Sequence, residues 1–420
     1  MIDYKKHKTF CPYPIKGAVI EGSNSMIKPC CRWDTKNHKL DTGVPFSYNN
    51  IWKDIRTKML KGEYVSGCVK CYKEEADGNR SMRTNALKNF VDDIKDVNHS
   101  IRGPFGYKET ILKTELEYLE IESGRYCNLK CRSCSPNLST SWDEDLKNNK
   151  DAEQNFYGGN KDIHPEMLSR PSINESIAEL TYNDCKHLKE IKVTGGEPFL
   201  SDAFLKFLEN LVEWDISKNI TLDIFTNCSF FPKEKYRVLL PKFKCSYINL
   251  SLDAIGKRAE FIRKKCNWSI VEKVSQYWEQ ESLEHDNIKL QINHTVSLFN
   301  VLYLNEFIMW CVTNFNQDTF NDISFLDLTI VYGPDYLCLN NVSEVSKNRI
   351  IRSLELQIIE LKQKVNLQNA SKLYDQVLNT IKGKGTNLQS IFIQKTEMFD
   401  TIRKENWKET FPELAEVLNV

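Results

Sequence analysis

Three cysteines stand close together at Cys127, Cys131 and Cys134, in a Cys-x3-Cys-x2-Cys spacing that directly follows a strand-like run at residues 116–122. Three thiolates do not complete a four-thiolate structural zinc site, which would need a distant His or Cys as its fourth ligand. They can hold three corners of a cubane iron–sulfur cluster and leave the fourth iron open to a ligand. The spacing therefore predicts either an open cluster or a completed zinc site.

A second segment with ligand-binding character is Gly195-Gly196-Glu197-Pro198, at the end of a predicted strand over residues 190–194. Two glycines let backbone approach a ligand closely, and the Glu197 carboxylate can accept hydrogen bonds from an ammonium group. Alone, the segment is also compatible with an ordinary turn. Its place at the end of the strand that follows the cysteine motif favours a ligand site.

A second group of cysteines lies near the N-terminus. Cys11, Cys30, Cys68 and Cys71 are spaced C-x18-C-x37-C-x2-C, and Cys31 is an alternative to Cys30. A short hairpin over residues 18–27 and a helix over residues 48–61 are predicted between them. Four thiolates suit an iron–sulfur cluster or a zinc ion equally well, so this group predicts a metal site without deciding the metal.

From about residue 114 the pattern alternates between strands and helices such as 203–214 and 270–281. The predicted strands are residues 116–122, 190–194, 220–226, 247–252, 288–296 and 323–331. This alternation predicts an α/β fold with a parallel sheet. Six units fall short of the eight in a closed TIM barrel, so we expect a partial (β/α)6 TIM-like barrel. Polar side chains along one face of several strands, such as Asn249 and Gln291, predict a hydrated interior.

The expected organisation has three parts. A small cysteine-rich N-terminal domain covers residues 1–100, the partial barrel covers 114–335, and a helical C-terminal region covers 342–420. The C-terminal region is amphipathic and carries no ligand motif, so a helical cap or a partner-binding surface is expected there.

Composition narrows the class of protein. The 420 residues include 57 Lys+Arg and 57 Asp+Glu, and this balance argues against a broad nucleic-acid-binding surface. The N-terminal residues have no secretory signal pattern, and no apolar run is long enough to cross a membrane. We therefore expect a cytoplasmic protein, in which the 14 cysteines bind metals more readily than they form disulfides.

Together, in this order and on successive predicted strands, the motifs at residues 127–134 and 195–198 resemble those of the radical S-adenosylmethionine (SAM) enzymes. The resemblance covers residues 116–331. It implies that the three cysteines hold a [4Fe–4S] cluster whose fourth iron binds SAM, and that Gly195-Gly196-Glu197-Pro198 binds the SAM amino group. It further implies that Ser251, Asp253 and Arg263 help to hold the SAM ribose and carboxylate, with a ribose contact from Asn293.

Two positions depart from the family pattern. Ser133 stands where an aromatic residue near the adenine is usual, and Cys228 stands where Gly usually follows Thr226-Asn227. A hydroxyl offers no stacking face, so Arg132 or Tyr126 is the candidate for stacking on the adenine. Cys228 is the one isolated cysteine predicted to lie near the site. The others are predicted to be small buried side chains, and they are Cys185, Cys245, Cys266, Cys311 and Cys338.

The N-terminal cysteines resemble a SPASM/twitch domain, which binds an auxiliary [4Fe–4S] cluster in many radical SAM enzymes. That domain usually follows the barrel, whereas here it precedes it. A zinc knuckle is the alternative.

The resemblance implies reductive cleavage of SAM to a 5′-deoxyadenosyl radical, which abstracts hydrogen from an unknown substrate, a peptide or a small molecule. An external electron donor such as a flavodoxin or ferredoxin is implied as a partner. Two alternatives stay open: a radical SAM enzyme that modifies nucleosides or RNA, and a non-catalytic metal-binding scaffold. An intact Gly-Gly-Glu-Pro segment argues against the scaffold.

Overall fold

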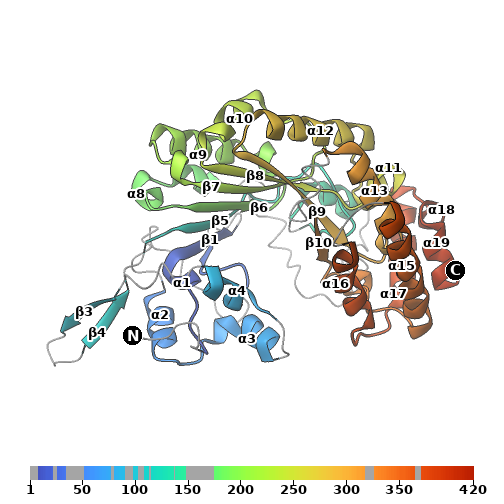
Figure 1. Ribbon diagram of the computed structural model, residues 1–420, viewed down its shortest axis with the longest axis horizontal. Coiled ribbons are helices and arrows are strands. Elements are labelled where there is room, and N and C mark those ends of the chain that lie inside the picture. The colour runs from blue at the N-terminus through green and yellow to red at the C-terminus, as the bar shows by residue number, and fades with distance from the viewer. Residues whose placement is uncertain are drawn as a thin grey trace. The chain divides into compact units, whose positions relative to one another are not determined.

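The computed structural model describes residues 8–21, 26–34, 52–76, 80–89, 98–102, 108–112, 115–136, 138–147, 175–316, 326–364 and 370–420. The chain divides into two compact units. The first unit comprises Met1–Arg125, Arg170–Ile224 and Glu234–Ser246, and the second comprises Tyr126–Ser169, Phe225–Lys233 and Tyr247–Val420. Figure 1 shows their elements.

In the first unit, parallel strand pairs form the framework. Its strands are β1 (Gly17–Glu21), β2 (Met26–Lys28), β5 (Tyr118–Glu122), β6 (Glu190–Thr194) and β7 (Thr221–Thr226), whose last two residues belong to the second unit. β5 pairs in parallel with β6, and β6 with β7. The predicted N-terminal hairpin is present as the antiparallel pair β1–β2, and β1 also pairs in parallel with β5. The N-terminal residues thus extend the sheet of the barrel strands.

Helices of the first unit include one with a clear apolar face, α9 (Asp202–Glu213), which confirms the helix predicted at 203–214. The Ser201 hydroxyl caps it by accepting the Phe204 N–H, and Phe204, Phe207 and Leu211 are buried along one side. The other α-helices and a separate hairpin are α1 (Tyr13–Lys16), α2 (Lys53–Leu60), α3 (Val69–Ala76), α4 (Met82–Asn89), α8 (Tyr182–Cys185), α10 (Glu234–Leu239), β3 (Asn98–Arg102) and β4 (Lys108–Leu112). Residues 48–51 of the predicted helix over 48–61 lie outside the described residues.

The second unit contains most of β8 (Cys245–Ser251) together with β9 (Ile288–Val296) and β10 (Leu326–Ile330), which pair in parallel. Residues 323–325 of the predicted sixth strand lie outside the described residues. In β9, buried and partly exposed residues alternate, as the sequence predicts. The described α-helices of the second unit are α5 (Asp143–Lys147), α11 (Gly256–Ile262), α12 (Trp268–Glu284), α13 (Leu304–Asn314), α15 (Glu344–Lys364), α16 (Ala370–Lys382), α17 (Gln389–Arg403), α18 (Trp407–Thr410) and α19 (Pro412–Leu418).

Among the described residues, the strands form one eight-stranded sheet in the order β10-β9-β8-β7-β6-β5-β1-β2, and a separate two-stranded sheet contains β3 and β4. The expected α/β class is confirmed, and the six predicted strands correspond to β5 to β10. No helix within the described ranges is long and apolar enough to cross a membrane.

The C-terminal helices, red in Figure 1, are joined to the rest of the second unit by aromatic packing. Phe411, just before α19, contacts Phe261 of α11 with ring centroids 5.2 Å apart. Phe299 contacts Phe392 of α17 at 5.1 Å. All four rings are at least 96% buried. Burying such rings is among the larger contributions to a core, so these helices are an integral part of the unit.

Candidate cluster and ligand site

The cysteine loop, residues 126–134, is held by backbone hydrogen bonds to the last residue of α11 and to the segment that follows it. The Lys130 N–H donates to the Lys264 carbonyl at 3.0 Å, and the Arg132 N–H donates to the Ile262 carbonyl at 2.8 Å. Within the loop, the Cys134 N–H donates to the Cys131 carbonyl at 3.1 Å. These bonds fix the backbone on both sides of Cys131 without involving its thiol.

The three thiols of the loop interact electrostatically. Burial raises the pKa of Cys134 to about 12, and the nearby Cys127 raises it further. Burial likewise raises the pKa of Cys131 to about 12, with an added contribution from Cys134, while the positive charge of Arg263 opposes the rise. Thiols with such pKa values are protonated at neutral pH, so a metal that binds them must displace their protons.

The number of cysteines in the loop suits an open cubane cluster. Within the described ranges, no three Cys, His, Asp or Glu side chains converge as ligands of one metal ion. A cubane cluster does not need such convergence, because each thiolate binds a different iron. Three thiols, at Cys127, Cys131 and Cys134, are the number of protein ligands that a [4Fe–4S] cluster with one open iron takes.

Asn227, at the end of β7, positions the first cysteine. Its side-chain N–H donates to the Cys127 Sγ at 3.7 Å and to the Asn128 Oδ1 at 3.0 Å. The orientation of the amide is fixed because its Oδ1 accepts both the N–H and the hydroxyl of Ser229, at 2.9 and 2.6 Å. Sequence reasoning noted Asn227 only as part of a motif; the structure shows that it hydrogen-bonds the Cys127 thiol.

Cys228 adopts a left-handed backbone conformation, with φ 57°. Side chains with a Cβ rarely adopt this conformation, which explains why glycine suits the position. The side chain is fully buried, and its thiol lies 3.8 Å from the Thr226 carbonyl oxygen.

Arg263 lies beside Cys131 and is held by Asp253. One carboxylate oxygen of Asp253 accepts the Arg263 Nε–H at 2.8 Å, and the other accepts the Thr295 N–H at 3.0 Å. Burial lowers the pKa of Arg263, but the negative charge of Asp253 opposes this, and the guanidinium stays charged. Asp253 is 1% exposed, and its position makes it the residue that orients Arg263.

The other predicted SAM contacts of the second unit lie on neighbouring strands. Ser251 ends β8, and Asn293 lies in β9 opposite Asp327 of β10. Both side chains are partly exposed, and the Asn293 carbonyl accepts the Leu252 N–H at 3.1 Å. The second unit thus brings the three cysteines together with Asp253 and Arg263, and it also holds Ser251 and Asn293.

The Gly-Gly-Glu-Pro segment belongs to the first unit, where its backbone touches the end of β5. Gly195 has φ +107°, and a Cβ there would lie 2.9 Å from both the Gly124 carbonyl oxygen and the Ser123 nitrogen. The Gly196 N–H donates to the same Gly124 carbonyl at 2.7 Å. This close approach of two backbones requires glycine at position 195.

Glu197 is buried and begins a short 3₁₀ helix over Pro198–Leu200. Its Oε1 accepts the Phe199 N–H at 3.3 Å, and Pro198 fills the first helical position, where a missing N–H costs nothing. This local structure fixes the carboxylate of Glu197 in a conformation set by the backbone.

The N-terminal thiols gather in the first unit. Burial raises the pKa of Cys11 above its usual range, and Cys68 and Cys71 raise it further. The pKa of Cys30 is raised by burial and by its neighbours Cys11, Cys31 and Cys68. Cys31 is exposed, and its sulfur lies 3.5 Å from that of Met82. Cys30 interacts with Cys11 and Cys68, whereas the main neighbours of Cys31 are Glu120 and Lys192, so Cys30 is the better placed of the two candidates.

A buried cation accompanies these thiols. Arg83, which sequence reasoning missed, donates to the Phe10 carbonyl at 3.0 Å and to Glu75 at 2.9 Å through its Nε. Its charge lowers the pKa values of Cys11 and Cys68, against the larger effect of burial. No short sequence motif marks this residue.

Two sequence-based predictions are wrong. Arg132 does not offer its guanidinium for stacking on an adenine: it is 2% exposed, lies 3.8 Å from the centroid of the Phe261 ring and pairs with two carboxylates. Cys245 and Cys266 are partly exposed rather than buried, whereas Cys185, Cys311 and Cys338 are buried as predicted. Tyr126 is 44% exposed and remains the aromatic candidate within the loop.

Comparison with known proteins gives a family match for part of the chain. The radical SAM superfamily model matches residues 121–292. This stretch is therefore similar to a radical SAM superfamily domain.

Similar proteins include two GTP 3′,8-cyclases. That of Aliarcobacter butzleri (strain RM4018) is 27% identical over 181 residues, 43% of this chain and 46% of that protein. That of Campylobacter lari (strain RM2100 / D67 / ATCC BAA-1060) is 25% identical over 146 residues, 35% of this chain and 37% of that protein. The chain thus spans less than half the length of these curated relatives.

Solved structures with some similarity include Streptococcus suis SuiB bound to S-adenosylmethionine, at 16% identity and a TM-score of 0.37, covering 76% of this chain and 60% of that one. Native anSMEcpe with bound AdoMet has 18% identity and a TM-score of 0.37, covering 66% of this chain and 66% of that one.

We expect Asn227→Ala to lower the reduction potential of the cluster, because the hydrogen bond to Cys127 disperses the negative charge of the sulfur. Loss of such a supporting contact should also cost about 10-fold in activity. Redox titration followed by EPR would measure the potential. Ser229→Ala, which leaves the donor N–H in place, should have a smaller effect, and an unchanged potential in Asn227→Ala would refute the role.

We expect Gly195→Ala to destabilise the protein by about 1–3 kcal/mol, from a strained φ and a clash with the backbone of residues 123–124. Thermal unfolding would measure the change. Gly256→Ala is the matched control, because Gly256 also has a positive φ, +54°, but open space around it. Equal destabilisation of the two variants would show that the close approach at Gly195 is unimportant.

Proposed function

We propose that this protein is a radical SAM enzyme that reductively cleaves SAM at a [4Fe–4S] cluster bound by Cys127, Cys131 and Cys134. The observation that carries the proposal is the close grouping of these thiols beside the Arg263–Asp253 pair, within the stretch that matches the radical SAM superfamily model. When bound, the cluster supplies the electron that cleaves SAM to methionine and a 5′-deoxyadenosyl radical, which abstracts hydrogen from the substrate.

The protein's own residues then serve to bind and orient SAM. Arg263 gives its Nε–H to Asp253, so its terminal nitrogens can donate to the SAM carboxylate in a charge-assisted pair. Glu197 is the proposed acceptor for the SAM ammonium group. Ser251 and Asn293 are the proposed ribose contacts, since both are partly exposed polar side chains on adjacent strands.

We further propose that Cys11, Cys30, Cys68 and Cys71 bind an auxiliary [4Fe–4S] cluster in a twitch-type N-terminal domain. Their mutual electrostatic interactions support one common site. The buried charge of Arg83 would stabilise the anionic cluster. Zinc in the same four-thiolate site is the alternative.

The substrate class is proposed as a peptide or small molecule, with electrons supplied by an external donor such as a flavodoxin or ferredoxin. A nucleotide substrate is the second candidate, favoured by the 27% identity to a GTP 3′,8-cyclase over 43% of this chain.

Anaerobically reconstituted protein should contain about eight irons, four per cubane, and should convert SAM to 5′-deoxyadenosine when reduced. Simultaneous replacement of Cys127, Cys131 and Cys134 by Ala should abolish cleavage and leave about four irons, because the N-terminal site is unaffected. Iron analysis and chromatography of the nucleoside product would test this. Wild-type protein that holds only zinc and leaves SAM intact would exclude the proposed activity.

The auxiliary site can be tested by itself. Cys30→Ala should lose about four irons, whereas Cys31→Ala, the matched control one residue away, should lose none. Zinc in place of these irons would overturn the auxiliary cluster without affecting the SAM-binding cluster. If Cys31→Ala lost iron and Cys30→Ala did not, the ligand would be Cys31 and not Cys30.

A further inference from the structure

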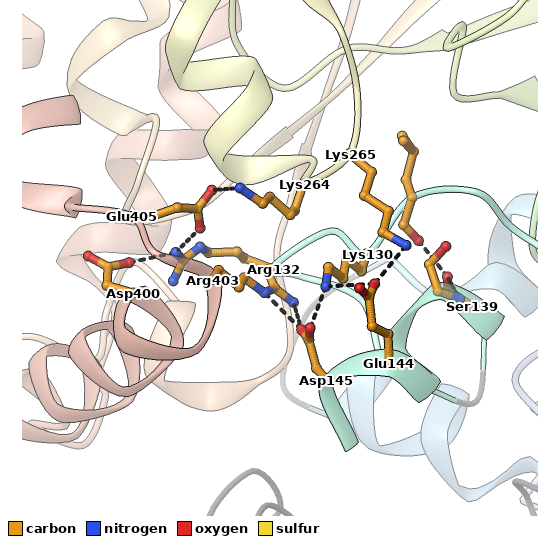
Figure 2. Close-up of polar contacts among 12 residues, drawn as sticks. Lys130, Arg132, Ser139, Glu144, Asp145, Lys264, Lys265, Asp400, Arg403 and Glu405 are labelled. Carbon is orange, nitrogen blue, oxygen red and sulfur yellow. Dashed lines mark hydrogen bonds and ion pairs between the residues drawn. The ribbon is translucent and has the colours of Figure 1, made fainter. Parts of the chain in front are cut away.

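Of the two residues that flank Cys131, Arg132 contacts side chains of the C-terminal region directly, and Lys130 is linked to that region through a carboxylate that it shares with Arg403. Figure 2 shows this network. Arg132 donates through Nη2 to Asp400 of α17 at 2.6 Å and to Glu405, between α17 and α18, at 2.7 Å. The other oxygen of Glu405 pairs with Lys264 at 2.9 Å. The Lys264 carbonyl also accepts the Lys130 N–H. Glu405 therefore contacts a side chain from each of the two backbone segments that this hydrogen bond joins.

Lys130, on the other side of Cys131, is linked to the C-terminal region by the carboxylate of Asp145, which also pairs with Arg403. Its ammonium pairs with Asp145 of α5, and the second oxygen of Asp145 accepts the Arg403 Nε–H at 2.9 Å. Arg403 is the last residue of α17. Both flanking residues of Cys131 are thus connected to the same C-terminal segment, residues 400–405 (Figure 2).

These charges are removed from water. Exposed side-chain fractions are 2% for Arg132, 0% for Arg403 and 3% for Asp145. The Arg132 Nε and Nη1 atoms make no hydrogen bond within the described part of the chain. The guanidinium therefore hydrogen-bonds its two carboxylates through Nη2, and its face lies over the Phe261 ring. A buried cation that loses its carboxylates is strongly unfavourable, so the geometry of the network is tightly constrained.

The network and the Cys131 thiol have different partners. Lys130 and Arg132 contact Asp145, Asp400 and Glu405. Cys131, between them, interacts with Arg263 and Cys134. The acidic side chains therefore act on the ligand thiol through the backbone of the loop.

We propose that the C-terminal segment 400–405 is the positioning element of the SAM-binding cluster: Asp400, Glu405 and Arg403 hold Arg132 and Lys130, and thereby set the position of Cys131. This inference rests on the proposed radical SAM function and assigns to the C-terminal helices a role beyond that of a cap. The three residues are positioning residues, because they act on the thiols only through other side chains, those of Arg132, Lys130 and Lys264.

Glu405→Gln tests the proposal, because the substitution keeps the size of the side chain and removes one of the two carboxylates of Arg132. We expect the SAM-responsive cluster to lose iron to a chelator about 10- to 100-fold faster than in wild type, as for other outer contacts of metal ligands. The EPR signal of the reduced cluster, before and after addition of SAM, follows this site specifically. We also expect a change in the g-values of that signal.

Two comparisons separate positioning from a general loss of stability. Glu397→Gln is the matched control: Glu397 lies on α17 and pairs with Lys408 at 3.2 Å. It should behave as wild type. Because Glu405 acts chiefly through Arg132, the effects of Arg132→Gln and Glu405→Gln on iron loss should be less than additive in the double variant.

Unchanged iron loss and unchanged g-values in Glu405→Gln would overturn the proposal, as would equal effects in Glu397→Gln or additive effects in the double variant. Wild-type protein that forms no SAM-responsive cluster would instead refute the proposed function, so the two failures are distinguishable.

Discussion

The ion pairs of Arg132 with Asp400 and Glu405 are the interaction on which the second unit most depends. A guanidinium that is 2% exposed is stable only with its partners, and breaking such a buried pair costs about 3–5 kcal/mol. These pairs join the cysteine loop at one end of the unit's sequence to its last helices. The aromatic packing of Phe261, Phe299, Phe392 and Phe411 joins the same two regions through apolar contacts.

Each cysteine group has a cation close to its thiols. Arg263 lies beside Cys131, and Arg83 lies near Cys11 and Cys68. In each case the cation is held by a carboxylate, Asp253 or Glu75. Burial opposes ionisation of thiols, and a fixed positive charge lowers that cost when a metal displaces their protons. The same physical arrangement thus supports both proposed clusters.

The sequence predicted the parts that depend on local pattern. Strand–helix alternation predicted β5 to β10, and the apolar stripe predicted α9. Asn227, Arg83 and the Arg132 network escaped prediction because their partners are distant in sequence: Asp400 lies 268 residues from Arg132. Arg132 was misjudged because exposure cannot be read from spacing. The sequence does not reveal that distant carboxylates pair with Arg132, and a cation next to a cysteine is then easily taken for a ligand-binding side chain.

The central claim is that SAM binds directly to the cluster held by Cys127, Cys131 and Cys134. Electron–nuclear double resonance on reduced protein, with SAM labelled with ¹⁵N at its amino group and ¹³C at its carboxylate, tests it most directly. We expect hyperfine coupling of both labels to the cluster spin, lost when Cys131 is replaced by Ala. A paramagnetic cluster that shows no coupling to either label in the wild-type protein would contradict the assignment.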